Sequence, residues 1–130
     1  MTTSIKIEVS PGEFIDKLTI SDIRRGRVRD PEKRANVEVE HRALRTVYET
    51  LLPSLSRISE LKAKLQCINE ALWDIEEEIR ECERRCDFGP KFIELARSVY
   101  KTNDRRSAVK SEINSALGSK IVEEKSYKPY

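Results

Sequence analysis

Histidine, glycine and cysteine are scarce in this 130-residue sequence, which has one His, four Gly and three Cys. The lone histidine, His41, has charged neighbours, so we expect a surface or half-buried helix residue rather than the base of a catalytic pair. The glycines form no phosphate-binding loop motif. Cys67, Cys82 and Cys86 form no CxxC pair, and Cys82 and Cys86 are expected on a buried helical seam. We therefore expect no metal and no cofactor.

Long apolar runs are also missing. The first residues, MTTSIKIEVSPGEF, lack the apolar stretch of a signal peptide, and no stretch approaches the roughly 18 apolar residues of a membrane span. We therefore expect a cytoplasmic protein without membrane contacts. Charge is nearly balanced, with 25 basic and 23 acidic residues. Nucleic-acid binding is not expected on that balance, although residues 24–30, RRGRVRD, form a local basic patch.

Charged residues make up 37% of the chain and hydrophobic residues 38%, a mixture typical of long amphipathic helices. The apolar spacing predicts an all-α fold with a four-helix arrangement in one domain, residues 1–130. The expected helices cover residues 11–28, 31–52, 54–86 and 90–117, and a tail follows at 119–130. Residues 4–9, SIKIEV, alternate like a short strand and form either an edge for dimerisation or an extended arm.

Several helix ends carry clear signals. Ser10 before Pro11, with Glu13 following, predicts a capped start for the first helix. Asp30 before Pro31 predicts the second start in the same way. Gly118 is a natural stop for the fourth helix.

The third and fourth helices are predicted to form a long antiparallel hairpin, because only residues 87–89 connect them. On the fourth helix, Asn103, Arg106 and Lys110 occupy the face that should be apolar, so these polar groups need partners. Folding the hairpin at residues 87–88 places the acidic edge of the third helix opposite basic residues of the fourth. The expected neighbours are Asn69 and Glu70 with Arg105 and Arg106, Asp74 with Lys101, and Glu78 with Arg97. The polar layer is then either an ion-pair ladder or a ligand site.

The tail also carries apolar residues, Ile121 and Val122. Apolar side chains are more stable when they are packed away from water, so we expect residues 119–127 to fold back along the helices. Lys125 and Tyr127 would then close the polar layer at Asn103 and Arg106.

Four segments, PGEFIDKLTI, NEALWDIEEEIRECE, DFGPKFIELARSVYKTNDRRSAVKSEIN and EEKSY, resemble a small family of helical proteins with no established activity. The resemblance runs from Pro11 to Tyr127. It implies members in bacteria and some large viruses, often encoded near glycosyltransferase and surface-polysaccharide genes. Ser21 stands where the family pattern has Leu. The resemblance implies a site formed by the unchanged residues Asp16, Lys17, Trp73, Asp74, Arg97, Tyr100, Asn103, Asp104, Arg106, Lys125 and Tyr127.

These features favour a non-catalytic binding or accessory protein, linked by the resemblance to glycoconjugate or surface-polysaccharide assembly. We expect it to form a homo-oligomer or to dock on a protein partner. The alternative is a small helical enzyme or a binder of an anionic small molecule such as a nucleotide sugar. The acidic run Glu77-Glu78-x-x-Glu81 resembles a magnesium-binding helix, but the second carboxylate cluster that such sites need is missing.

Overall fold

The structure, a computed structural model, describes residues 2–130 apart from the side chain of Leu52, so Met1 of the expected domain lies outside it. The fold is all-α, and residues 2–130 contain no strand. The long helices are α1 (Pro11–Arg27), α2 (Pro31–Thr50), α4 (Ser59–Arg84) and α5 (Pro90–Ala116). A short helix, α3 (Leu52–Leu55), and one 3₁₀ turn, η1 (Ser56–Ile58), connect α2 to α4.

The predicted caps are present. The Ser10 hydroxyl accepts the backbone N–H of Glu13 at 3.2 Å, and the Asp30 carboxylate accepts that of Lys33 at 3.0 Å. At the end of α5, Gly118 has a φ of 64°, and the N–H of Ser119 donates to the carbonyl of Asn114 at 2.9 Å. These bonds satisfy backbone groups that a helix leaves free at its ends.

The third predicted helix begins later than the expected residue 54, because the chain first turns through α3 and η1 and the long helix starts at Ser59. Pro53 lacks a backbone N–H and disfavours a continuous helix there. Leu55 and Ile58 are nevertheless buried. Leu55 and Ile58 therefore reach the core from the short helix α3 and the turn η1, and not from a continuous long helix.

The end of α4 corrects the expectation for Cys86. Cys82 is buried as expected, but Cys86 is exposed and has a φ of 54°. The N–H groups of Cys86 and Asp87 donate to the carbonyls of Glu83 and Cys82 at 3.0 and 2.9 Å. Cys86 therefore ends the helix in a left-handed conformation, a position that glycine usually occupies, instead of joining the seam.

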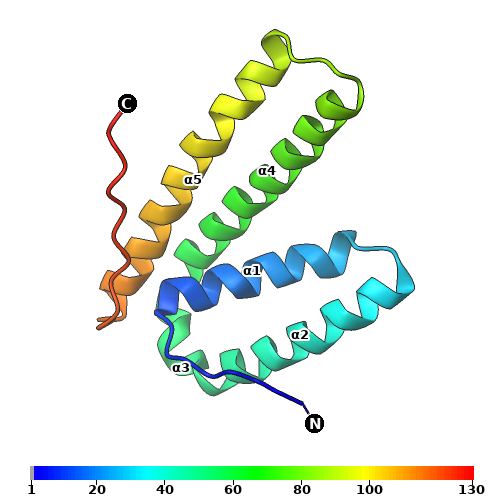
Figure 1. Cartoon of the computed structure of the whole chain (residues 1–130). Coiled ribbons are helices and arrows are strands. Elements are labelled where there is room, and N and C mark those ends of the chain that lie inside the picture. The colour runs from blue at the N-terminus through cyan, green and yellow to red at the C-terminus, as the bar shows by residue number, and fades with distance from the viewer. Residues whose placement is uncertain (1) are drawn as a thin grey trace.

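In space, α4 and α5 lie side by side and run in opposite directions, since residues 85–89 join them directly (Figure 1). Helix α1 contacts both of them at the end of the pair far from this connection, and α2 packs against α1. The two helices continue beyond α1 as a protruding pair. We call residues 75–101 of this pair the arm.

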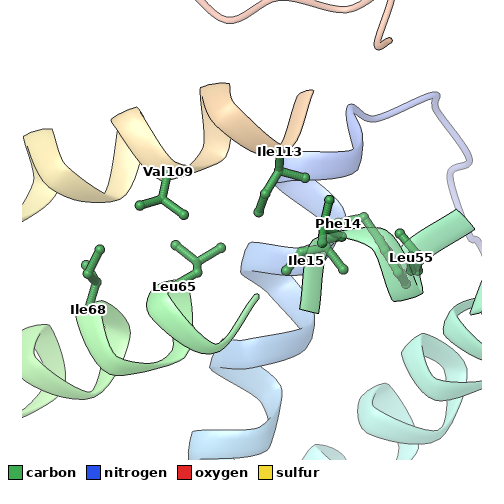
Figure 2. Close-up of a cluster of buried hydrophobic side chains, with 8 residues drawn as sticks. Phe14, Ile15, Leu55, Leu65, Ile68, Val109 and Ile113 are labelled. Carbon is green, nitrogen blue, oxygen red and sulfur yellow. The ribbon is translucent and has the colours of Figure 1, made fainter. Parts of the chain in front are cut away.

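The apolar core lies where α1, α3, α4 and α5 converge (Figure 2). Ile15, Leu65 and Ile113 point into it and are fully buried. Residues 2–9, in contrast, form neither helix nor strand, and Ile5 and Ile7 are exposed. Within residues 2–130, no helix combines the length and apolar character that crossing a membrane requires.

Candidate functional site

A buried carboxylate, Asp16 of α1, is the centre of a polar cluster at the crossing of α1, α4 and α5. Its side chain is 2% exposed. Arg106 Nε of α5 donates to Asp16 Oδ1 at 2.9 Å, and Arg106 Nη2 binds Asp16 Oδ2. Asn69 Nδ2 of α4 donates to Asp16 Oδ1 at 3.0 Å and to Thr19 Oγ1 at 2.9 Å. One carboxylate therefore connects three helices.

This geometry corrects the predicted partner of Arg106. Glu70 does not pair with it and instead accepts a hydrogen bond from Gln66 Nε2 at 3.1 Å. The inference that Arg106 needs a partner is confirmed, but the carboxylate comes from α1, 90 positions earlier in the chain. The register of the hairpin relates only α4 and α5, whereas in the structure α1 packs against the polar face of α5 and supplies the carboxylate.

Lys110 continues the cluster toward the surface. Its Nζ lies 2.7 Å from Glu13 Oε2, 3.8 Å from Asp16 Oδ2 and 3.4 Å from Glu123 Oε2. Burial alone would lower the pKa of Lys110, but the hydrogen bond to Glu13 and the negative charges of Asp16 and Glu13 outweigh it and raise that pKa. The ammonium is thus held in its charged form.

The carboxylates of the cluster are held ionised in the same way. The hydrogen bond from Lys110 lowers the pKa of Glu13. Burial alone would raise the pKa of Asp16, but hydrogen bonds from Arg106 and Asn69 and the charges of Arg106 and Lys110 outweigh it, so that pKa is lowered. Among the described residues, every buried side-chain nitrogen and oxygen has a hydrogen-bond partner. The cluster is therefore closed within the fold.

A groove of about 500 Å³ lies between α5 and the C-terminal tail. The tail turns back after Gly118 and runs alongside α5, as we expected from its apolar residues (Figure 1). Five of the predicted site residues line this groove: Tyr100, Asn103, Asp104, Lys125 and Tyr127. Val99, Lys128, Pro129 and Tyr130 complete the lining.

The tail is held to α5 by specific contacts. The Tyr130 hydroxyl donates to Asp104 Oδ2 at 2.7 Å, and the Tyr130 ring packs edge-on against Tyr100 with centroids 5.1 Å apart. Lys125 Nζ lies 5.7 Å from the centre of the Tyr127 ring. These residues give the groove aromatic faces together with an ammonium group.

The sequence profile of a family of unknown function, DUF6165, matches residues 5–130. The chain belongs to this family. No curated protein matches it, and no solved structure matches it. Every residue of the cluster and of the groove falls inside the span of DUF6165.

The DUF6165 chain places its other predicted site residues elsewhere. Trp73 and Asp74 lie on α4 beside Arg27 of α1: Arg27 Nη1 contacts Asp74 Oδ1 at 2.5 Å, and its guanidinium lies 5.8 Å from the Trp73 ring centre. Lys17 is exposed and 3.7 Å from Glu13, and Arg97 is 3.6 Å from Glu94 of its own helix. The predicted residues therefore fall into separate surfaces rather than one site.

The expected ion-pair ladder between α4 and α5 is not formed. Among residues 2–130, no ion pair joins these two helices; Asp74 pairs with Arg27 and Arg97 with Glu94, while Glu78 and Lys101 form no ion pair. Instead, the acidic edge of α4 and the basic edge of α5 remain separate.

His41 is more buried than the sequence indicated, at 7% exposure between α1 and α2. Arg25 Nη1 lies 3.2 Å from His41 Nε2, and Ser21 Oγ lies 3.3 Å from Nδ1. A guanidinium only donates, so the contact with Arg25 requires Nε2 as the acceptor. Ser21 supplies this polar contact and is itself 1% exposed, so its position is packed and not vacant.

Sequence reasoning placed Asn69 near Arg106, where both side chains bond Asp16 Oδ1, but it missed Thr19, Glu13 and Tyr130 as members of these polar contacts. Asn69 sits on the apolar seam of α4 next to Ile68, and a polar residue at such a position is a signal that a buried partner exists. No comparable pattern in the sequence indicated that Tyr130 would contact α5. Within the described residues, no group of three or more His, Cys, Asp or Glu side chains is placed to hold a metal ion.

Proposed function

We propose that this chain is a non-catalytic binding protein and that the groove between α5 and the tail is its binding surface. The observation that carries the proposal is the convergence of Tyr100, Asn103, Asp104, Lys125 and Tyr127 on one groove. Concave surfaces with aromatic walls and a few polar groups are the usual form of small-molecule sites.

The state of the buried charges supports binding over catalysis. A general acid or base needs a pKa near the working pH and a free path to its substrate. Asp16, Arg106 and Lys110 have pKa values displaced away from neutrality and are engaged with one another. They stabilise the wall of the groove, since Arg106 Nη1 also donates to Asn103 Oδ1 at 3.4 Å.

The lining favours a sugar that carries a phosphate. Tyrosine rings can cover the apolar face of a sugar ring, Asn103 and Asp104 can bind its hydroxyl groups, and Lys125 and Lys128 can bind a phosphate. Such a ligand agrees with the role in glycoconjugate or surface-polysaccharide assembly that the family resemblance implies. We propose the cytoplasm as its location, where nucleotide-activated sugars are made.

The second candidate is a small enzyme acting on the same class of anionic molecule, such as a nucleotide sugar. The two lysines of the groove favour it, because they would bind the same phosphate groups. Turnover of the nucleotide sugar would distinguish this candidate from simple binding.

The test is a titration of the isotopically labelled protein with UDP-N-acetylglucosamine, UDP and N-acetylglucosamine, followed by amide NMR shifts. We expect saturable shifts at the groove with the nucleotide sugar. Lys125→Ala should weaken this binding about tenfold, the size of one charge-assisted contact. Lys120→Ala, which removes an exposed tail lysine outside the groove, should leave it unchanged.

Three outcomes would count against the proposal. Shifts that cluster away from the groove would remove it as the binding surface. The absence of any saturable shift with all three probes would remove the ligand class. Release of UDP during the titration, detected by phosphorus NMR, would replace binding by catalysis.

A further inference from the structure

The arm, residues 75–101 of α4 and α5, is a two-helix projection that no third helix covers; the tail reaches it only at Val99 and Tyr100. Cys82 is its one buried residue among those described, at 4% exposure. The apolar residues that should form its core, such as Ile75, Ile79 and Leu95, are only half-buried. Phe88 and Ile93 are 52% and 54% exposed. Two helices alone cannot cover their shared apolar seam, and this one is left partly open to solvent.

The two sides of the arm have opposite charge. On α4, residues 75–84 hold five Glu and two Arg, so their net charge is −3. On α5, residues 90–101 hold Lys91, Arg97 and Lys101 against Glu94, so their net charge is +2.

These charges do not neutralise one another across the arm. The ion pairs that the described residues form here stay on one helix or at its end, as in Arg80–Glu76, Arg84–Glu81 and Arg97–Glu94. The charged side chains of Glu78, Lys91 and Lys101 form no ion pair within residues 2–130. The arm thus presents an acidic edge and a basic edge beside an open apolar seam.

We propose that the arm docks on the arm of a second copy of this chain, with α4 of each copy against α5 of the other. A two-fold axis places the acidic edge of one copy on the basic edge of its partner, twice in the same interface. The second copy also covers the apolar seam, which turns the two helical pairs into a four-helix bundle. The chain is self-complementary in charge, so no other molecule is needed to match both edges.

The dimer should be weak and reversible. The arm extends roughly 15–18 Å beyond α1 and is about 20 Å wide, from the helical rise and diameter. A face of this size lies below that of standard stable complexes, which bury about 800 Å² on each partner. We therefore expect dissociation in the micromolar range and a strong dependence on salt, because the charged edges are exposed.

Sedimentation equilibrium of the full chain across a concentration series tests the proposal. We expect a monomer–dimer equilibrium. An acid-reversed variant, Glu78→Lys with Glu83→Lys, and a base-reversed variant, Lys91→Glu with Lys101→Glu, should each dimerise at least about tenfold more weakly, because like charges then face each other. An equimolar mixture of the two variants should dimerise again, since each reversed edge meets its complement on the other chain.

The matched control is Lys33→Glu with Arg42→Glu on α2, which changes the net charge as much as the base-reversed variant but away from the arm. It should dimerise like the unchanged protein. A strictly monomeric protein at all concentrations would overturn the second copy as the occupant. A dimer that is indifferent to both reversed variants would overturn the arm as the interface.

Hydrogen–deuterium exchange of the unchanged protein gives a measurement that does not depend on how the variants fold. We expect amides of residues 75–101 to gain protection as concentration rises, while those of α2 do not. Concentration-dependent protection confined to α2 or residues 2–9 would contradict the proposal. The readout is also separate from the ligand groove, because self-association is measured without any sugar or nucleotide.

Discussion

At the scale of single residues, Asp16 determines how three helices meet. Its carboxylate receives hydrogen bonds from Arg106 and Asn69 and lies close to the ammonium of Lys110. Removing a buried carboxylate leaves its positively charged partners buried without a counter-charge. The folded state then loses more free energy of unfolding than the original ion pair had contributed. Its effect on stability should therefore be large and should depend on Arg106.

A double-mutant cycle of Asp16→Ala and Arg106→Ala measures this dependence by urea unfolding. We expect Asp16→Ala to lower the free energy of unfolding by about 3–5 kcal/mol and Arg106→Ala by about 2–4 kcal/mol. The coupling between them should be about 1–3 kcal/mol. The control cycle pairs Arg106→Ala with Glu70→Ala. Coupling there as large as with Asp16 would restore Glu70 as the partner and contradict the observed geometry.

The same residues predict how stability depends on pH. The folded state lowers the pKa of Asp16 from 3.8 and that of Glu13 from 4.5, so the unfolded chain takes up protons at higher pH than the folded one. Their contribution to stability is complete above the unfolded values and is lost as pH falls through the lowered ones. Asp16→Asn should therefore make the urea midpoint less dependent on pH between about pH 5 and about pH 2. An unchanged slope would show that other carboxylates govern acid unfolding.

At the scale of elements, Gly12 allows α1 to touch α5. A Cβ on Gly12 would lie 2.5 Å from the backbone oxygen of Lys110 and 2.9 Å from Asn114 Oδ1. The N–H of Gly12 also donates to Asn114 Oδ1 at 2.7 Å. The close approach of these two backbones brings Glu13 and Asp16 within reach of Lys110 and Arg106.

Gly12→Ala should destabilise the protein by about 1–3 kcal/mol, because the helices must separate to admit the methyl group. Gly26→Ala is the matched control in the same helix. Nothing lies within 4 Å of a Cβ at Gly26, so it should stabilise by about 0.5–1 kcal/mol through helix propensity. Thermal melting of both variants measures the difference. Similar changes in both melting temperatures would show that helix propensity, and not the close contact with α5, determines the effect of Gly12→Ala on stability.

The elements were more predictable from sequence than their contacts. Ser10, Asp30 and Gly118 mark helix ends through local hydrogen bonds, and the structure has helix ends at all three. The break before Ser59 was missed because Leu55 and Ile58 fit helical spacing and are buried in a turn instead. The pairing of Arg106 with Asp16 was missed because no local pattern tells which helix crosses a hairpin. Periodicity identifies a face that needs a partner, but only the three-dimensional packing identifies that partner.

At the scale of the whole molecule, the two ends of the chain differ in what they touch. Residues 2–9 are mostly exposed and form no regular structure, whereas the tail lies along α5 and completes the groove. Both ends lie outside the apolar core, which α1, α3, α4 and α5 build. The folded core and the groove should therefore respond differently to removal of the tail.

Truncation after Ser119 removes the tail and keeps the bond from Ser119 to Asn114 that ends α5. The melting temperature should fall by only a few degrees, since no residue from 120 to 130 is buried and the lost pair of Lys110 and Glu123 is partly exposed. Binding of the nucleotide sugar should be abolished, because Lys125 and Tyr127 form one wall of the groove. Deletion of residues 2–9 is the control and should leave binding intact. If the truncated protein still binds with unchanged affinity, the tail is not a wall of the site and the ligand is held elsewhere. If the truncated protein fails to fold, the tail is part of the core, and the division between scaffold and groove is wrong.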